Sequence, residues 1–292
     1  MRNSLHLPRA EFEALYPYDA DDHLLYFGLP APKKSIFSIP RLKGSKKKFM
    51  DLYSRNKILI ESLDQEDIDS LAWAEWEETS FQRFIKLYQT GQEHIDHDAI
   101  KARLSALQFP LCFYDYETVA TPIPLLEWTS PRQQVVVQYS LHIMQADGTI
   151  EHHSDIVPAA AKDNYSVVAS LAGCAPQDGT YIVWNKSFEC DRNKEIIQRY
   201  PEFTELFTYI NNHTFDLMEI LKEREYFHPD FQGSYSIKKV LPVVTDISYE
   251  NLAVADWGIA TELLQKLIKN TLDNTPQTVA NLLEYCKLDT RA

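Results

Sequence analysis

The spacing of apolar residues changes near residue 108, and this change limits the folds that the chain can adopt. Apolar residues recur at helical spacing over 46–60, 65–90 and 97–107. Beyond them, short apolar or alternating runs indicate strands at 109–118, 133–144, 148–157 and 180–185. The sequence therefore predicts a mostly helical N-terminal region, 1–107, followed by an α/β domain, 108–292.

In the second part of the chain, the order of the predicted strands and helices indicates the type of fold. A meander of strands is followed by a predicted helix at 164–173, a strand at 180–185 and a helix at 187–200. A last helix is expected to begin at Thr275 and Pro276, because proline is favoured in the first turn of a helix. This order resembles a ribonuclease-H-like mixed sheet flanked by helices.

Composition narrows the class of protein. The 292 residues include 45% hydrophobic side chains, enough to bury a core, and no apolar run is long enough for a membrane helix. The four cysteines form no C-x-x-C pair, so we expect a reducing, cytoplasmic location. The formal charge of −13 argues against a simple basic nucleic-acid binder. A metal-dependent nuclease tolerates such a charge better, because bound cations reverse the sign at the site.

Two acids mark the end of the first predicted strand. Asp115 and Glu117 are two residues apart, and alternation along a strand places them on one face. Carboxylates this close repel each other unless a cation lies between them, and Mg²⁺ and Mn²⁺ prefer such oxygen ligands. The alternative is that the pair only ends a strand and faces water, which is the commoner situation for so short a motif.

Two further acidic positions occur later in the chain. Glu189 lies in the first turn of the predicted helix that follows the strand ending near Asn185. An acid there can also serve only the helix dipole, and Asp191 is a nearby alternative ligand. Tyr285 and Asp289 are four residues apart, so a helix would place both on one face. In isolation this pair is more often a half-buried tyrosine and a surface acid.

Taken in order, these motifs resemble those of the DnaQ-like (DEDD) 3′-to-5′ exonuclease superfamily, in its tyrosine subtype. The superfamily motifs D-x-E, N-x-x-F-D and Tyr-x-x-x-Asp correspond to residues 115–117, 185–189 and 285–289. The chain departs from them at Glu189, where the superfamily usually has Asp. Stretches such as 115–143 and 233–242 look closer still to the bacterial domain of unknown function 2779 family, which often follows a RecB-like nuclease domain and typically carries Glu at this position.

The resemblance implies a metal-dependent exonuclease acting on the 3′ ends of single-stranded DNA or RNA. Two Mg²⁺ or Mn²⁺ ions would be held by Asp115, Glu117, Glu189 and Asp289, with Tyr285 positioning the attacking water. Strand contacts are expected from Asn185, Tyr235, Ser236, Lys238 and Lys239. For the last four, a solvated helix start is an equally good reading.

Three alternatives stay open at the level of sequence. A ribonuclease-H-like endonuclease would use similar acids on a similar sheet. A catalytically weak or inactive nucleic-acid-binding module would keep the acids without turnover, and we expect this if the final helix, which stops three residues after Asp289, is truncated. A structural partner of a RecB-like nuclease is the third. Independently of these alternatives, the family resemblance implies that residues 1–107 are the tail of a RecB-like region.

Overall fold

The computed structural model describes residues 35, 36, 39, 46–71, 75–249, 252–254, 257–273 and 275–291. The chain forms two compact units, Met1–Asp96 with Arg224–Val243 and His97–Glu223 with Val244–Ala292. Residues 1–34 of the predicted N-terminal region lie outside the described residues. The domain boundary at 107/108 stays a prediction; the compact units divide at Asp96/His97, and the chain returns to the first unit at Arg224.

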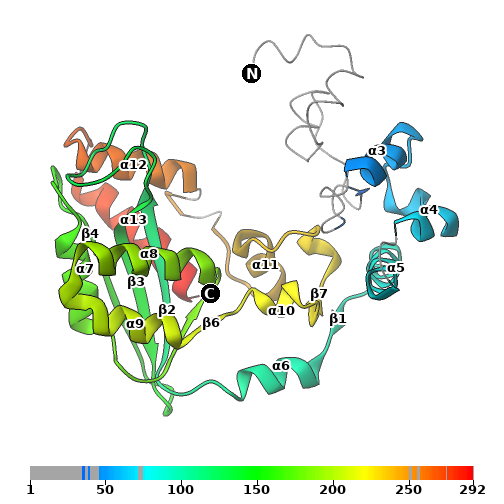
Figure 1. Cartoon of the computed structure of the whole chain (residues 1–292), viewed down its shortest axis with the longest axis horizontal. Coiled ribbons are helices and arrows are strands. Elements are labelled where there is room, and N and C mark those ends of the chain that lie inside the picture. The colour runs from blue at the N-terminus through cyan, green and yellow to red at the C-terminus, as the bar shows by residue number, and fades with distance from the viewer. Residues whose placement is uncertain are drawn as a thin grey trace, which may run out of the picture. The chain divides into compact units, whose positions relative to one another are not determined.

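The first unit is mainly helical, as the spacing of its apolar residues predicts (Figure 1). Its elements are α3 (Lys46–Ser54), η4 (Ile60–Ser62), α4 (Gln65–Ser70), α5 (Glu75–Thr90), β1 (His94–Ile95), β7 (Tyr226–Phe227), η6 (Pro229–Phe231) and most of α11 (Ile237–Val244). The strands β1 and β7 form a short antiparallel ladder. This ladder joins the two sequence segments of the unit, which more than a hundred residues separate.

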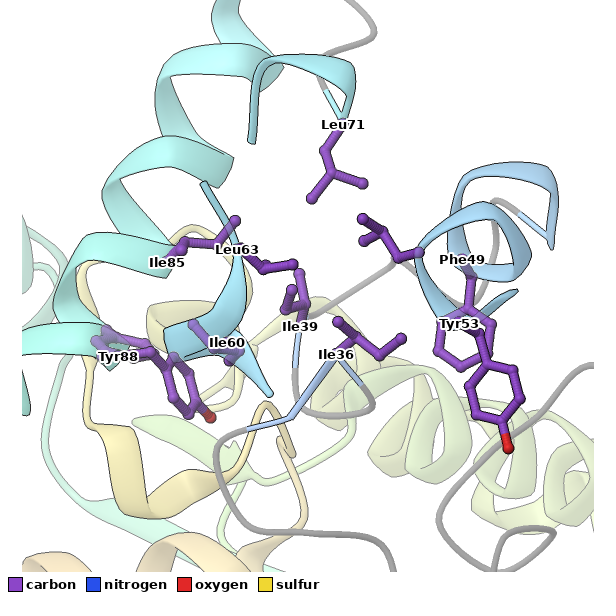
Figure 2. Close-up of a cluster of buried hydrophobic side chains, with 11 residues drawn as sticks. Ile36, Ile39, Phe49, Tyr53, Ile60, Leu63, Leu71, Ile85 and Tyr88 are labelled. Atoms are coloured by element: carbon purple, nitrogen blue, oxygen red, sulfur yellow. The ribbon is translucent and has the colours of Figure 1, made fainter. Parts of the chain in front are cut away.

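A cluster of buried apolar side chains holds the first unit together. Figure 2 shows Ile36 and Ile39 between two residues of α3, Phe49 and Tyr53, and Tyr88 of α5. Farther along the cluster, the rings of Phe84, Tyr88 and Phe227 approach one another with centroids 4.6–5.2 Å apart. Aromatic pairs in this geometry contribute about 0.5–1.5 kcal/mol each beyond the area that they bury.

Asp67 is a buried acid in the first unit with two cationic partners. Its carboxylate lies 2.5 Å from Arg55 Nη1 and 2.8 Å from Lys57 Nζ, and the side chain is 1% exposed. It also accepts from the backbone N–H of Asp64, which closes a capping box at the start of α4. Burial opposes its ionisation, but the hydrogen bonds from Lys57 and Arg55 prevail and lower its pKa to about 2.

We therefore expect Asp67→Asn to destabilise the first unit by on the order of 3 kcal/mol at pH 7, because two cations lose a buried partner. A carboxyl with a lowered pKa stabilises the fold above its unfolded pKa, so the difference from wild type should shrink as pH falls from about 4 to about 2. Urea unfolding at several pH values measures this difference in the free energy of unfolding. Glu66→Gln, an exposed acid on the same helix, is the control and should change little.

The second unit is built on a mixed sheet with the strand order β4-β3-β2-β5-β6. Its strands are β2 (Leu111–Val119), β3 (Val135–Met144), β4 (Ile150–Ile156), β5 (Thr180–Val183) and β6 (Thr214–Asp216). β2, β3 and β4 pair antiparallel, whereas β5 and β6 run parallel to β2. An α/β domain with its first strands in a meander is therefore confirmed. The central strands β2 and β3 are buried along most of their length, although both carry polar side chains among the apolar ones.

Helices cover both faces of this sheet (Figure 1). Those of the second unit are α6 (His97–Leu104), α7 (Tyr165–Cys174), α8 (Lys186–Arg199), η5 (Pro201–Phe203), α9 (Thr204–Asn212), α10 (Glu219–Lys222), α12 (Trp257–Ile268) and α13 (Thr275–Arg291). α7, α8 and α9 lie on one face, and α12 and α13 lie on the other. Among the described residues, no helix combines the length and apolar character needed to cross a membrane.

The parallel pairing of β2 with β5 begins at a close backbone contact. The N–H of Thr180 donates to the carbonyl of Pro110, and Gly179 precedes it with a φ of +77°. A Cβ on Gly179 would lie 2.0 Å from the oxygen of Pro110, so no side chain fits without moving a strand.

Gly179→Ala should therefore lower the free energy of unfolding by on the order of 3 kcal/mol, combining a left-handed φ with a backbone clash. Gly148→Ala separates the two effects, because Gly148 has a φ of +86° but open space around it. We expect Gly148→Ala to lower the free energy of unfolding by about 1 kcal/mol. Gly173→Ala, with neither strain nor a neighbour within 4 Å, should not destabilise the protein. Equal melting temperatures for all three variants would contradict the proposed clash.

Candidate functional site

The end of β2 presents different chemistry on its two faces. Tyr114 and Tyr116 face α8, where the hydroxyl of Tyr116 donates to Asn193 Oδ1 at 2.8 Å and Asn193 Nδ2 donates to Tyr114 at 3.2 Å. Alternation then turns Asp115 and Glu117 to the opposite side. Glu117 is buried and Asp115 is partly buried, so the pair does not simply end a strand in water.

Helix α13 packs against this second face. Its backbone is held by Gln138 of β3, whose buried amide donates to the carbonyl of Leu282 at 2.7 Å. The thiol of Cys286 lies 4.0 Å from Asp115 Oδ2. One ligand atom each from Asp115, Glu117 and Cys286 lies within 4.8 Å of the others. Cys286 was not predicted as a neighbour of these acids, although its place three residues before Asp289 puts it on the same helix face.

Asp289 lies one turn farther along α13, beside two tyrosines. It accepts a short hydrogen bond from the hydroxyl of Tyr249, and the ring of Tyr249 lies 6.2 Å from that of Tyr285. Burial, followed by the negative charge of Asp289, raises the pKa of Tyr249. Burial and then the charges of Glu117 and Asp289 likewise raise the pKa of Tyr285. Tyr249 was not recognised from the sequence, because nothing in its local sequence places it beside α13.

Glu189 is the most deeply buried member of the group. Its side chain is 3% exposed, and Oε2 has no hydrogen-bond partner among the described residues. Its pKa is raised first by burial and then by the negative charges of Glu117 and Asp289, while Arg192 opposes the shift. β2, α8 and α13 thus bring four acids, distant in sequence, into one electrostatic group. We call Asp115, Glu117, Glu189 and Asp289 the acidic cluster.

The remaining predicted site residues are not part of this cluster. Asn185 is exposed at the start of α8 and accepts a hydrogen bond from Ser187. Asp191, the alternative ligand on α8, is exposed and paired with Lys194 at 2.8 Å. The other four, Tyr235, Ser236, Lys238 and Lys239, lie around the start of α11 in the first unit, and their role as strand contacts stays a prediction.

A polar network anchors the end of α13 next to Asp289. The hydroxyl of Thr290 lies 2.7 Å from Ser140 Oγ and 2.8 Å from His142 Nδ1, and Ser140 Oγ lies 3.0 Å from His152 Nε2. The rings of His142 and His152 are cross-strand neighbours on β3 and β4, with centroids 4.3 Å apart. These contacts hold the last turn of α13 on the sheet and so fix where Asp289 can point.

Burying several carboxylates together should destabilise the fold when no divalent cation is present. In the presence of a chelator, Glu189→Gln should therefore raise the free energy of unfolding by on the order of 1 kcal/mol, because it removes a buried like charge while keeping the shape. Asp191→Asn, an exposed acid two residues away, should change it by less than about 0.5 kcal/mol. Thermal unfolding measures both; a clear loss of stability in Glu189→Gln would contradict the repulsion described here.

The segment that carries β2 to β7 is recognised by a family model. Residues 112–236 match the domain of unknown function family (DUF2779). This match covers the two acids of β2 and Glu189 but ends before Tyr285 and Asp289. It confirms the predicted likeness to that family, while no solved structure matches the chain.

Three uncharacterized proteins from Mycoplasma and Ureaplasma species are similar over a longer stretch. The MG366 homolog of Mycoplasma pneumoniae is 29% identical over 62% of this chain and 30% of its own length. The MG366 protein of Mycoplasma genitalium and the UU173 protein of Ureaplasma parvum are each 26% identical over 72% of this chain and 34% of their own length. The chain therefore spans about a third of the curated relatives that it matches.

Proposed function

We propose that the second unit is a metal-dependent 3′-to-5′ exonuclease that hydrolyses phosphodiester bonds of DNA or RNA. The observation that carries this proposal is the close approach of Asp115 and Glu117 beside α13, where the charges of Glu189 and Asp289 act on the same buried group, Cys286. Tyr285 lies on the same helix as Asp289. The order of strands and helices supports it, because a ribonuclease-H-like, DnaQ-like domain would have such a meander followed by helix, strand and helix.

The residues of the acidic cluster fit a site for Mg²⁺ or Mn²⁺. Hard divalent cations take oxygen ligands, and the cluster supplies four carboxylates. The unpartnered Oε2 of buried Glu189 is the kind of atom that a cation would satisfy. Bound ions would supply positive charge against the negative charge that develops at phosphorus. Cys286 adds a thiol beside Asp115, a softer ligand than the resemblance implies.

The chain's own residues would then divide the work of hydrolysis. Tyr285 has a hydroxyl kept protonated by burial, so it can donate to or orient an attacking water. Tyr249 donates to Asp289 and so fixes which carboxylate oxygen faces the cluster. The packing of α13 on β2 and β3 sets the distance between Asp289 and Glu117, which a frayed helix would lose. We include in this proposal that a RecB-like nuclease is a partner of the chain.

The experiment combines ion binding with strand cleavage. The protein should bind Mn²⁺ by calorimetry and shorten a 5′-labelled single strand stepwise from its 3′ end, on DNA or RNA. Asp115→Asn should lower cleavage by at least about 100-fold, as expected when a group that stabilises charge in the transition state is removed. Asp191→Asn is the matched control and should cleave normally.

The products and the variants separate the alternatives. Internal fragments instead of a ladder would indicate an endonuclease. Binding of the strand without any cleavage would indicate a non-enzymatic module. Equal cleavage by wild type and Asp115→Asn would refute the assignment of the acidic cluster to catalysis.

A further inference from the structure

A pocket of about 260 Å³ lies in the second unit beside α8. Residues of the loop between β2 and β3 and of the C-terminal half of α8 line it. They include Trp128, Gln133, Gln134, Arg192, Gln198 and Arg199. None of the four acids of the acidic cluster lines it. The pocket is therefore a separate feature, and the function proposed above leaves it unexplained.

Hydrogen bonds hold the walls of this pocket in place. Arg199 Nη2 donates to the carbonyl of Glu127 at 2.7 Å, and the N–H of Glu127 donates to the carbonyl of Lys162 at the same distance. The hydroxyl of Tyr200 donates to Asn164 Oδ1 at 2.9 Å. These hydrogen bonds hold Arg199 and Tyr200 of the lining in place, so a ligand would meet a formed site and lose little affinity to ordering it.

Trp128 is placed at the pocket in a way that packing alone does not explain. Its side chain is 89% exposed, although an indole ring gains most when buried. Its backbone has a φ of +61°, a left-handed conformation that bulky residues rarely adopt. An unfavourable backbone conformation of this kind is typical of residues at binding sites. An exposed indole beside a pocket offers a flat surface on which a planar ring can stack.

The charged groups of the pocket favour an anion. Arg192 and Arg199 face one acid, Glu195, which pairs with Arg192 Nη2 at 2.7 Å. The Nε of Arg192 is buried and has no hydrogen-bond partner among the described residues. The guanidinium of Arg199 lies 5.4 Å over the ring of Tyr200, which orients its donors. One excess positive charge at this place is notable in a chain of net charge −13.

We propose that this pocket is a nucleotide subsite distinct from the acidic cluster, where a base stacks on Trp128 and its phosphate is bound by Arg192 and Arg199. Arginine matches phosphate geometry, and the side-chain amides of the glutamines can pair with base edges. The volume is near the lower end for ligand pockets, about 300–1,000 Å³, so it suits one nucleotide unit and no more. That unit is a free nucleoside monophosphate or one nucleotide of a strand.

The test is metal-free binding of nucleoside 5′-monophosphates, with adenosine and uridine monophosphate as probes in the presence of a chelator. We expect binding that quenches tryptophan fluorescence. Trp128→Ala and Arg199→Ala should each weaken binding by about tenfold or more, the effect of losing one stacking or charged contact. Trp257→Ala and Lys194→Ala are the matched controls, an exposed indole and an exposed cation outside the pocket, and should bind like wild type.

Asp115→Asn distinguishes this inference from the proposed nuclease activity. If the subsite is separate, that variant should bind the mononucleotide normally even though it no longer cleaves. A wild-type protein that cleaves strands but binds no mononucleotide would overturn the subsite alone. Loss of metal-free binding in Asp115→Asn would also overturn it, because the ligand would then occupy the acidic cluster.

Competition identifies the source of the nucleotide. A short single strand that displaces the mononucleotide, and that binds Trp128→Ala more weakly than wild type, supports a strand-binding subsite. A strand that fails to displace it supports a site for free mononucleotides. Inorganic phosphate that competes as well as the nucleotide, with no effect of Trp128→Ala, would overturn the proposal, because only an anion would then be recognised.

Discussion

The burial of like charges is the constraint on which the second unit depends. Glu189 and Glu117 are both nearly inaccessible, and the negative charge of Glu117 disfavours the ionisation of Glu189. A low-dielectric setting strengthens this repulsion, so the surrounding packing must hold the acids together. Natural sequences tolerate such local conflict mainly where function requires it. This conflict is why the acidic cluster, and not another polar group of the chain, is the basis of the proposed function.

The architecture supplies that restraint from both faces of the sheet. On one side, Asn193 ties α8 to the two tyrosines of β2, which fixes the helix that carries Glu189. On the other face, α13 is anchored at two positions along its length that flank Tyr285. Gln138 binds the carbonyl of Leu282, and Ser140 binds the hydroxyl of Thr290. β2 lies between these contacts and turns alternate side chains to each face. A strand in this central position can serve both as a structural core and as the base of the acidic cluster.

The acidic cluster and the nucleotide subsite place opposite charges in one unit. The cluster concentrates carboxylates, whereas the pocket beside α8 carries two arginines and one acid. Arg192 links them electrostatically, because it lines the pocket and also opposes the raised pKa of Glu189. The matched stretch makes up about a third of the length of the uncharacterized relatives, so the activity of such a whole protein belongs to the proposal.

The sequence by itself determined the α/β class and the positions of the main strands, because strand alternation and helix spacing are local properties. It offered the four acids as candidates only through the resemblance of their motifs, and their role stays a proposal. Only the tertiary structure decided that Cys286 and Tyr249 join those acids, that Asp191 stays outside, and that Trp128 borders a pocket with Arg199. These contacts join residues far apart in the chain, and no local pattern encodes them. They arise where separate elements pack, so side-chain proximity there is a property of the whole fold.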